Sequence, residues 1–517
     1  MKKIIVKTDN TSQLYQLVKS LSGYEKAYLV KLAKRHTTSK PALHIKLLHL
    51  LFKTDSYNEK FLIAKLGINS GAQFSALKKH LFTEILDALI FLNRNRDTFW
   101  ESDKHIMIIE LLIDRKLFKT ARAMIAKHKK SADEGQYLIK QLRLLKIEFE
   151  LLLFNDGDLL NRQNALIRSH FEQVELSEKL NIIFRQLLVL RSTSNNRITE
   201  NETTEASQQA LMLDGFTPTP ASPPIIHILY YACRALASYM QLQELNSRQY
   251  SGQALEYWQK FPQLVKFHSW LFIEDAITAI YNSFAFATPA DTAAVLSTYK
   301  KLSERIGSRN ARRWQILEFN TELKIYHKTA NYEKVNELLE QRAADIELFA
   351  EKILPYSDNL TILSSLAISY FVLGDFNKAD ELIYKVKTML HHVKRPDILY
   401  FVQVFHLIIM YEMKDKYRLI TATDAAYKLL YGRKLLRPFE KEMILFIKSL
   451  AQTTNKSATQ KTMMRAIEKL ESFQNDSVKK MHFFYFNYYG WLQSKLDGVA
   501  YTDYVRAHFK NKTAEPV

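Results

Sequence analysis

Apolar side chains recur at helical spacing along most of the chain, and the pattern is clearest in residues 363–386. The first half of this stretch has apolar residues at i, i+3, i+4 and i+7, namely Leu363, Leu366, Ala367 and Tyr370. Gly374 then interrupts the pattern, and glycine readily adopts the left-handed conformation that ends a helix. The same spacing resumes with Ala379, Leu382, Ile383 and Val386. The stretch predicts two antiparallel helices whose backbones approach each other at small residues.

A related arrangement recurs along the chain: an aromatic or large apolar residue follows a turn, and a small or branched residue comes three positions later. The copies are Phe118 with Ala121, Tyr332 with Val335, Phe376 with Ala379, Tyr417 with Ile420, and a degenerate one at Leu159 with Arg162. The intervals 118–159, 332–376 and 376–417 are 41, 44 and 41 residues, and the gap of 173 from 159 to 332 is close to four such units. This regular spacing indicates a helical repeat protein.

The order of residue types in 360–388 resembles a tetratricopeptide repeat, on the evidence of Leu366, Ala367, Tyr370, Gly374, Phe376 and Ala379. Residues 311–342, with Tyr332, match less closely, and residues 401–430 keep Tyr417 but have Asp415 where glycine is expected. A tetratricopeptide unit is about 34 residues long, so the pairs of this chain have longer helices or loops. The resemblance implies an α-solenoid, a right-handed superhelix of helix pairs whose concave groove binds a peptide or a helix.

Residues 1–100 predict a basic N-terminal helical bundle. Helices are expected within 11–36 and over 41–53, 57–66 and about 73–93. Ser22 and Glu25 have the spacing of a capping box, in which each side chain accepts a hydrogen bond from the other residue's backbone N–H.

The rest of the chain divides by composition. Residues 101–194 are expected to be a helical-repeat region and residues 225–508 a solenoid similar to tetratricopeptide repeats, followed by a frayed tail over 509–517. Residues 195–224 are polar and rich in proline, which predicts a loop or linker with at most one short helix. Residues 482–491 read HFFYFNYYGW, and so aromatic a helix indicates either complete burial or an end that pairs with a partner.

Composition supports an all-α fold. Only 12 glycines and 11 prolines occur among 517 residues, which suits long helices joined by short connections. The net charge of +19 is uneven, because residues 1–150 contain 28 basic and 15 acidic side chains. A basic end favours encounters with anionic partners such as nucleic acid, an acidic protein or a membrane surface.

The sequence offers no recognisable catalytic chemistry. Cys233 is the single cysteine, which excludes intramolecular disulfides and CxxC motifs. Glycine is never followed by lysine, so a Walker A loop is absent, and GxGxxG, HExxH and GxSxG do not occur. We therefore expect a protein that is not an enzyme and that needs no cofactor and no metal.

Residues 58–82 faintly resemble a helix-turn-helix. A short helix is followed by a turn at 67–70 and by a helix carrying Lys78 and Lys79, which would approach phosphates or bases in the major groove. The simpler interpretation is a capping bundle at the start of the solenoid.

Two functions follow from these patterns. The first is a non-catalytic scaffold or adaptor that binds a protein or peptide in a superhelical groove. The alternative is a nucleic-acid-binding regulator that uses the basic N-terminal region. No apolar run reaches 18 residues, so we expect no membrane span and a cytoplasmic protein. The sequence leaves the oligomeric state open.

Overall fold

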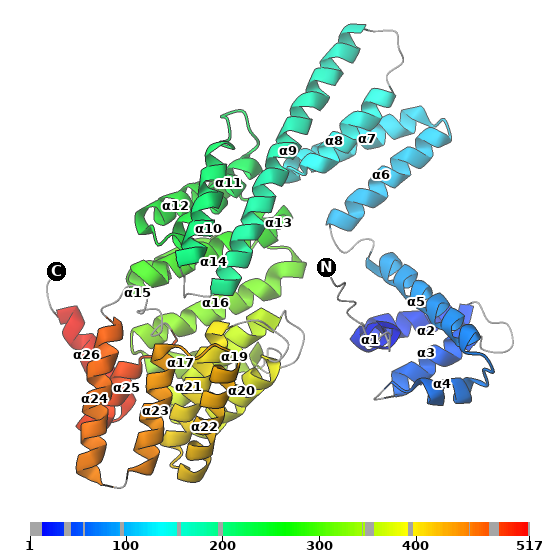
Figure 1. Ribbon diagram of the computed structural model, residues 1–517. Coiled ribbons are helices and arrows are strands. Elements are labelled where there is room, and N and C mark those ends of the chain that lie inside the picture. The colour runs from blue at the N-terminus through cyan, green and yellow to red at the C-terminus, as the bar shows by residue number, and fades with distance from the viewer. Residues whose placement is uncertain are drawn as a thin grey trace, which may run out of the picture. The chain divides into compact units, whose positions relative to one another are not determined.

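The computed structural model describes residues 13–35, 43–54, 57–93, 98–151, 157–194, 200–343, 345–346, 356–390, 396–453, 455–474 and 485–514. Helices are the only regular secondary structure in these ranges (Figure 1), which confirms the all-α class. The chain forms two compact units, Met1–His128 and Lys129–Val517. The first boundary lies beyond the predicted one at residue 100, because the helix from residue 98 and the first part of the next helix belong to the first unit.

The first unit contains the predicted N-terminal bundle. Its helices are α1 (Gln13–Ser20), α2 (Gly23–Arg35), α3 (Leu43–Lys53), α4 (Glu59–Leu66), α5 (Gly71–Asn93) and α6 (Thr98–Asp114), followed by the start of α7 (Phe118–Gly135). The predicted capping box is confirmed, since Ser22 N donates to Glu25 Oε2 at 2.8 Å and Glu25 N donates to Ser22 Oγ at 3.3 Å. The bundle core is contributed by α1 to α5, through residues such as Val18, Leu29, Leu47, Leu62 and Phe74.

The second unit begins with α8 (Leu138–Glu150), α9 (Gly157–Ser194), α10 (Glu200–Asp214), α11 (Pro224–Met240) and α12 (Glu244–Lys260). The degenerate repeat at residue 159 does form a packed pair, α8 with the 38-residue helix α9, but Leu159 and Arg162 are exposed and do not occupy buried positions. Of the predicted linker over 195–224, residues 195–199 lie outside the described residues, and the one helix that the prediction allowed is the 15-residue α10. Helix α10 buries Ala206 and Leu213 in the same core as α9 and α11, so its polar residues form the outer face of a packed helix.

The middle of the second unit consists of α13 (Leu264–Phe267), α14 (Ser269–Phe286), α15 (Pro289–Ser303) and α16 (Ser308–Lys328). Helix α14 is buried and carries two acidic residues. Glu274 pairs with Arg191 of α9 at 2.5 Å and with Arg313 of α16 at 2.6 Å, so one carboxylate joins three helices. Burial alone would raise the pKa of Glu274, but the two guanidinium groups lower it.

The last helices are α17 (Tyr332–Gln341), α19 (Tyr356–Val372), α20 (Phe376–Met389), α21 (Pro396–Glu412), α22 (Lys416–Gly432), α23 (Pro438–Gln452), α24 (Lys456–Gln474), α25 (Tyr488–Asp497) and α26 (Tyr501–Ala514). Helix α26 therefore continues through most of the predicted frayed tail. The predicted pair around Gly374 is confirmed: α19 and α20 pack together, and Leu366, Ala367 and Ala379 are fully buried between and around them. Gly374 turns the chain with φ +83°, a conformation that L side chains rarely adopt.

The turns of three helix pairs share one geometry. A residue with positive φ (Ala330, Gly374 or Lys414) precedes an N-cap (Asn331, Asp375 or Asp415) whose side chain accepts a hydrogen bond from the backbone of the first helical turn. In the third pair Lys416, and not Tyr417, is therefore equivalent to Phe376. The predicted register of this copy is wrong by one residue: Leu419 is buried at the position of Ala379, and Tyr417 is 85% exposed.

Candidate functional site

The sequence predicts a ligand groove but does not place it, and the long helices α19 and α21 of the second unit are the candidate surface for it. In this structure an aromatic segment, residues 485–491, lies against them. Phe486 packs between Phe371 of α19 and Phe405 of α21, with ring centroids 5.4 and 4.9 Å away. Tyr485 stacks on Phe401 of α21 at 4.9 Å. The inner helices therefore already hold a segment that is remote in sequence.

Polar contacts hold the same region in place. Trp491 is fully buried, and its Nε1 donates to Glu412 Oε1 at 2.6 Å. Lys495, one turn later on α25, pairs with the same carboxylate at 2.7 Å. Farther along, Arg506 of α26 pairs with Glu333 of α17 at 2.5 Å, an exposed contact. Aromatic rings thus cover the apolar surface of α19 and α21. The basic side chains of α25 and α26 form ion pairs with acidic side chains near the ends of α21 and α17.

Of the two alternatives for the aromatic run, burial holds for three of its described aromatic residues, whereas Tyr485 and Tyr489 are half-buried. Phe486, Tyr488 and Trp491 are at most 3% exposed, whereas residues 482–484 lie outside the described residues. The run is not helical throughout, because α25 begins at Tyr488 with Asn487 as its N-cap.

A second group of polar side chains joins α20, α21 and α22. Lys387 Nζ donates to His406 Nδ1 at 2.5 Å, and His406 Nε2 donates to Asp380 Oδ1 at 2.8 Å. Burial lowers the pKa of Lys387 to about 8 and also lowers that of His406, while the hydrogen bond from His406 lowers that of Asp380. Arg418 lies 3.5 Å from Asp380. Because protein groups already satisfy one another along this chain, we assign it to the packing of the three helices.

The remaining predicted repeat positions are structural. Tyr332 is 4% exposed, Phe376 packs edge-on against Phe371 at 5.3 Å, and Tyr370 lies under the ammonium of Lys378 at 4.4 Å. These contacts fix the turns of the pairs, whereas Tyr417 lies on the surface.

In the first unit, the two lysines of the helix-turn-helix hypothesis have different environments. Lys78 Nζ pairs with Glu59 Oε2 at 2.8 Å and lies 4.9 Å from the centre of the Phe74 ring, so it joins α5 to α4. Lys79 is exposed. Only the second of them is thus presented to solvent without a described ion pair.

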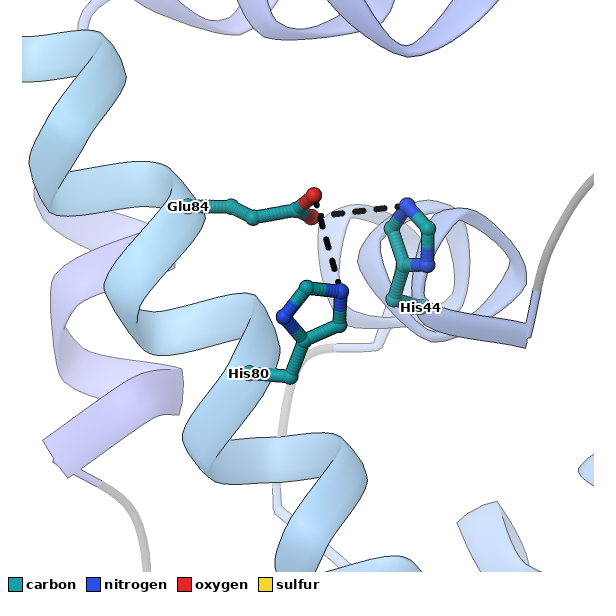
Figure 2. A group of neighbouring side chains, drawn as sticks. All are labelled: His44, His80 and Glu84. Atoms are coloured by element: carbon teal, nitrogen blue, oxygen red, sulfur yellow. Dashed lines mark ion pairs between the residues drawn. The ribbon is translucent and has the colours of Figure 1, made fainter. Parts of the chain in front are cut away.

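The sequence did not reveal one group of three side chains of types that can bind a metal ion. His44 of α3 and His80 and Glu84 of α5 have donor atoms that all lie within 4.8 Å of one another, and both imidazole rings face the carboxylate (Figure 2). His80 and Glu84 are four residues apart, a spacing visible in the sequence. Their approach to His44, 36 residues earlier, depends on the packing of α3 on α5.

None of the helices in the described ranges is both long enough and apolar enough to cross a membrane. Comparison with known proteins gives no family for the chain: no protein-family model matches the sequence, and none of the curated proteins is similar to it.

Proposed function

We propose that this protein is a non-catalytic scaffold that binds a protein segment along α19 and α21. The observation that supports this proposal is the aromatic segment itself. Phe486 and Tyr485 come from a remote part of the chain and lie on Phe371, Phe401 and Phe405, so these helices offer a surface that accepts aromatic side chains.

The contacts also define the chemistry of a partner. An aromatic residue followed four positions later by lysine reproduces Trp491 and Lys495, both of which bind Glu412. Such a segment would be a short helix, bound through ring contacts and one charge-assisted hydrogen-bonded pair. The partner would compete with the chain's own aromatic segment for the same surface. Its apparent affinity would therefore depend on the fraction of molecules in which that segment is displaced.

The test uses a labelled peptide spanning residues 485–500 and the full-length protein. Trp491→Ala weakens the chain's own contacts, so we expect the peptide to bind this variant at least about tenfold more tightly than the wild type. Lys495→Ala, which removes only the ion pair with Glu412, should give a smaller increase. Fluorescence anisotropy measures both affinities, and circular dichroism verifies that the variants keep their helices.

A further substitution provides the control. Adding Glu412→Gln to Trp491→Ala should weaken peptide binding again, because the peptide's own lysine loses its partner. Equal, saturable binding to the wild type and to both single variants would contradict the competition between the peptide and the chain's own segment. If the peptide binds to none of the three proteins, α19 and α21 do not form a peptide-binding surface.

The nucleic-acid alternative is supported by the excess of 13 positive charges in residues 1–150. Binding through phosphate contacts would fall by about 10³ or more between 50 and 200 mM salt if six or more lysines and arginines were involved. The measurement is the affinity of the full-length protein for labelled duplex DNA and single-stranded RNA at both salt concentrations. Lys79→Glu should weaken the binding more than Lys78→Glu, because Lys78 already pairs with Glu59.

A further inference from the structure

Helices α3 and α5 bring three donor side chains to the edge of the first unit's core. His44 lies in the first turn of α3 beside buried Ile45, and Glu84 lies on α5 beside buried Ile85. His80 is one turn before Glu84, so both side chains lie on the same face of α5. Apolar packing between these helices thus fixes the positions from which the three side chains extend.

The donor atoms have nearly the separations that a small cation requires. His44 Nε2 lies 3.4 Å from Glu84 Oε2, and His80 Nε2 lies 3.6 Å from Glu84 Oε1. In a tetrahedral zinc site with bonds of about 2.0–2.1 Å, neighbouring donors are about 3.3–3.4 Å apart. The two imidazole rings stand edge to face, with centroids 5.1 Å apart, and both face the same carboxylate (Figure 2). The two distances end at different oxygens of Glu84, and the three ligand atoms lie within 4.8 Å of one another, so a bound cation would draw the three side chains closer together.

The donor types narrow the choice of cation. Two imidazole nitrogens and one carboxylate oxygen suit Zn²⁺, whereas Mg²⁺ and Ca²⁺ prefer oxygen donors alone. The side chain of His80 is 58% exposed, so water reaches the group from one side.

We propose that His44, His80 and Glu84 form a Zn²⁺ site that joins α3 to α5 and keeps a fourth coordination position open to solvent. When the cation binds, three metal–ligand bonds take the place of the weak contacts between the Glu84 carboxylate and the two histidines. This site is independent of the scaffold proposal, because it lies in the other unit of the chain.

The experiment is a calorimetric titration of Zn²⁺ into full-length protein that a chelator has freed of metal. We expect the wild type to bind about one equivalent of zinc that His80→Ala and Glu84→Gln lose, or bind at least about tenfold more weakly. Co²⁺ serves as a second probe, since it absorbs visible light more strongly in a four-coordinate site than in water. Each ligand substitution should abolish that absorption.

Matched controls lie on the same two helices. His49 of α3 and Asp87 of α5 are exposed and lie outside the group, so His49→Ala and Asp87→Asn should bind Zn²⁺ as the wild type does. Circular dichroism without metal verifies that all four variants keep the wild-type helix content. The proposal is overturned if the ligand variants bind zinc like the controls, or if the wild type binds none.

Discussion

At the scale of single residues, the most unusual group is the buried carboxyl of Asp275 on α14. Its Oδ2 accepts hydrogen bonds from Trp258 Nε1 at 3.1 Å and from Tyr299 Oη at 2.9 Å. Its Oδ1 is buried and has no hydrogen-bond partner among the described residues. Burial disfavours the ionised form and raises the pKa of Asp275 to about 7, although the two hydrogen bonds act in the opposite direction.

This raised pKa gives the wild type a pH dependence that Asp275→Asn should remove. In the folded protein Asp275 holds its proton more tightly than in the unfolded chain, so the free energy of unfolding falls as pH rises from about 4 to about 7. Asparagine keeps an acceptor for Trp258 and Tyr299 and cannot ionise. Relative to the wild type, the variant should gain a few kcal/mol of stability between about pH 4 and pH 8. Urea unfolding at the two pH values measures the difference, and parallel pH profiles would refute the explanation.

Other residues show how far the sequence leads at this scale. Ser22 and Glu25 could be identified as a capping box because a cap is local. The group of His44, His80 and Glu84 could not be foreseen, since only the packing of two helices brings His44 to the others. The contact of Phe486 with Phe371, across 115 residues, was equally invisible, and the sequence indicated only that the aromatic run would be buried or paired.

At the scale of elements, the turn geometry decides which residues enter the core. The aromatic Tyr417 suggested the equivalent of Phe376, but the backbone places the N-cap at Asp415 and turns Leu419 inward. Residue type alone thus gave the wrong register. An aromatic side chain can stand at the first helical residue after the N-cap, as Phe376 does, or at the second, as Tyr417 does. In the same way, the polar composition of 200–214 concealed a helix with a narrow buried face.

The corrected register of α22 predicts unequal effects of two alanine substitutions. Leu419→Ala should destabilise the second unit by about 2–5 kcal/mol, because it leaves a cavity between packed helices. Tyr417→Ala should change stability by about 0.5 kcal/mol or less, since the ring is exposed. Thermal or urea unfolding compares the two, and a larger loss for Tyr417→Ala would restore the register inferred from the sequence.

The close approach of α19 and α20 predicts that a large residue cannot replace Ala379. Ala379→Glu would place a charge in a fully buried position and should cost several kcal/mol. The matched control is Asn377→Glu, two residues earlier on the exposed face of α20, where an acidic residue near a helix start is tolerated. Lys378 is a poorer control, because its ammonium lies over the Tyr370 ring. Similar unfolding midpoints for the two glutamate variants would contradict the packing.

At the scale of the whole molecule, contacts between distant parts of the sequence complete the core of the second unit. Trp491 bonds to Glu412, and Tyr488 packs on Phe439 of α23 with centroids 5.4 Å apart. Helices α19 and α21, which a tetratricopeptide groove would leave open, are buried along nearly their whole described length. The helix pairs could be predicted from local periodicity, whereas the completion of this core depends on contacts that no local pattern encodes.

Trp491→Ala should therefore destabilise the second unit by about 3–5 kcal/mol, through the lost ring volume and the lost hydrogen bond to Glu412. Tyr384→Ala removes an aromatic ring of α20 that is 68% exposed, and should have little effect. The free energies of unfolding of both variants, measured in urea, test whether the aromatic segment is part of the core.

The late position of the aromatic segment in the sequence has a consequence for synthesis on the ribosome. Arg506 meets Glu333 across 173 residues, so the surface around α17 and α19 is complete only after those residues have been translated. At about 5–20 residues per second this takes roughly 10–35 s. For part of that interval, from their own synthesis until residues 485 and 486 are translated, Phe371, Phe401 and Phe405 lack the rings that cover them in the folded protein. Until then the exposed aromatic surface of the nascent chain favours aggregation.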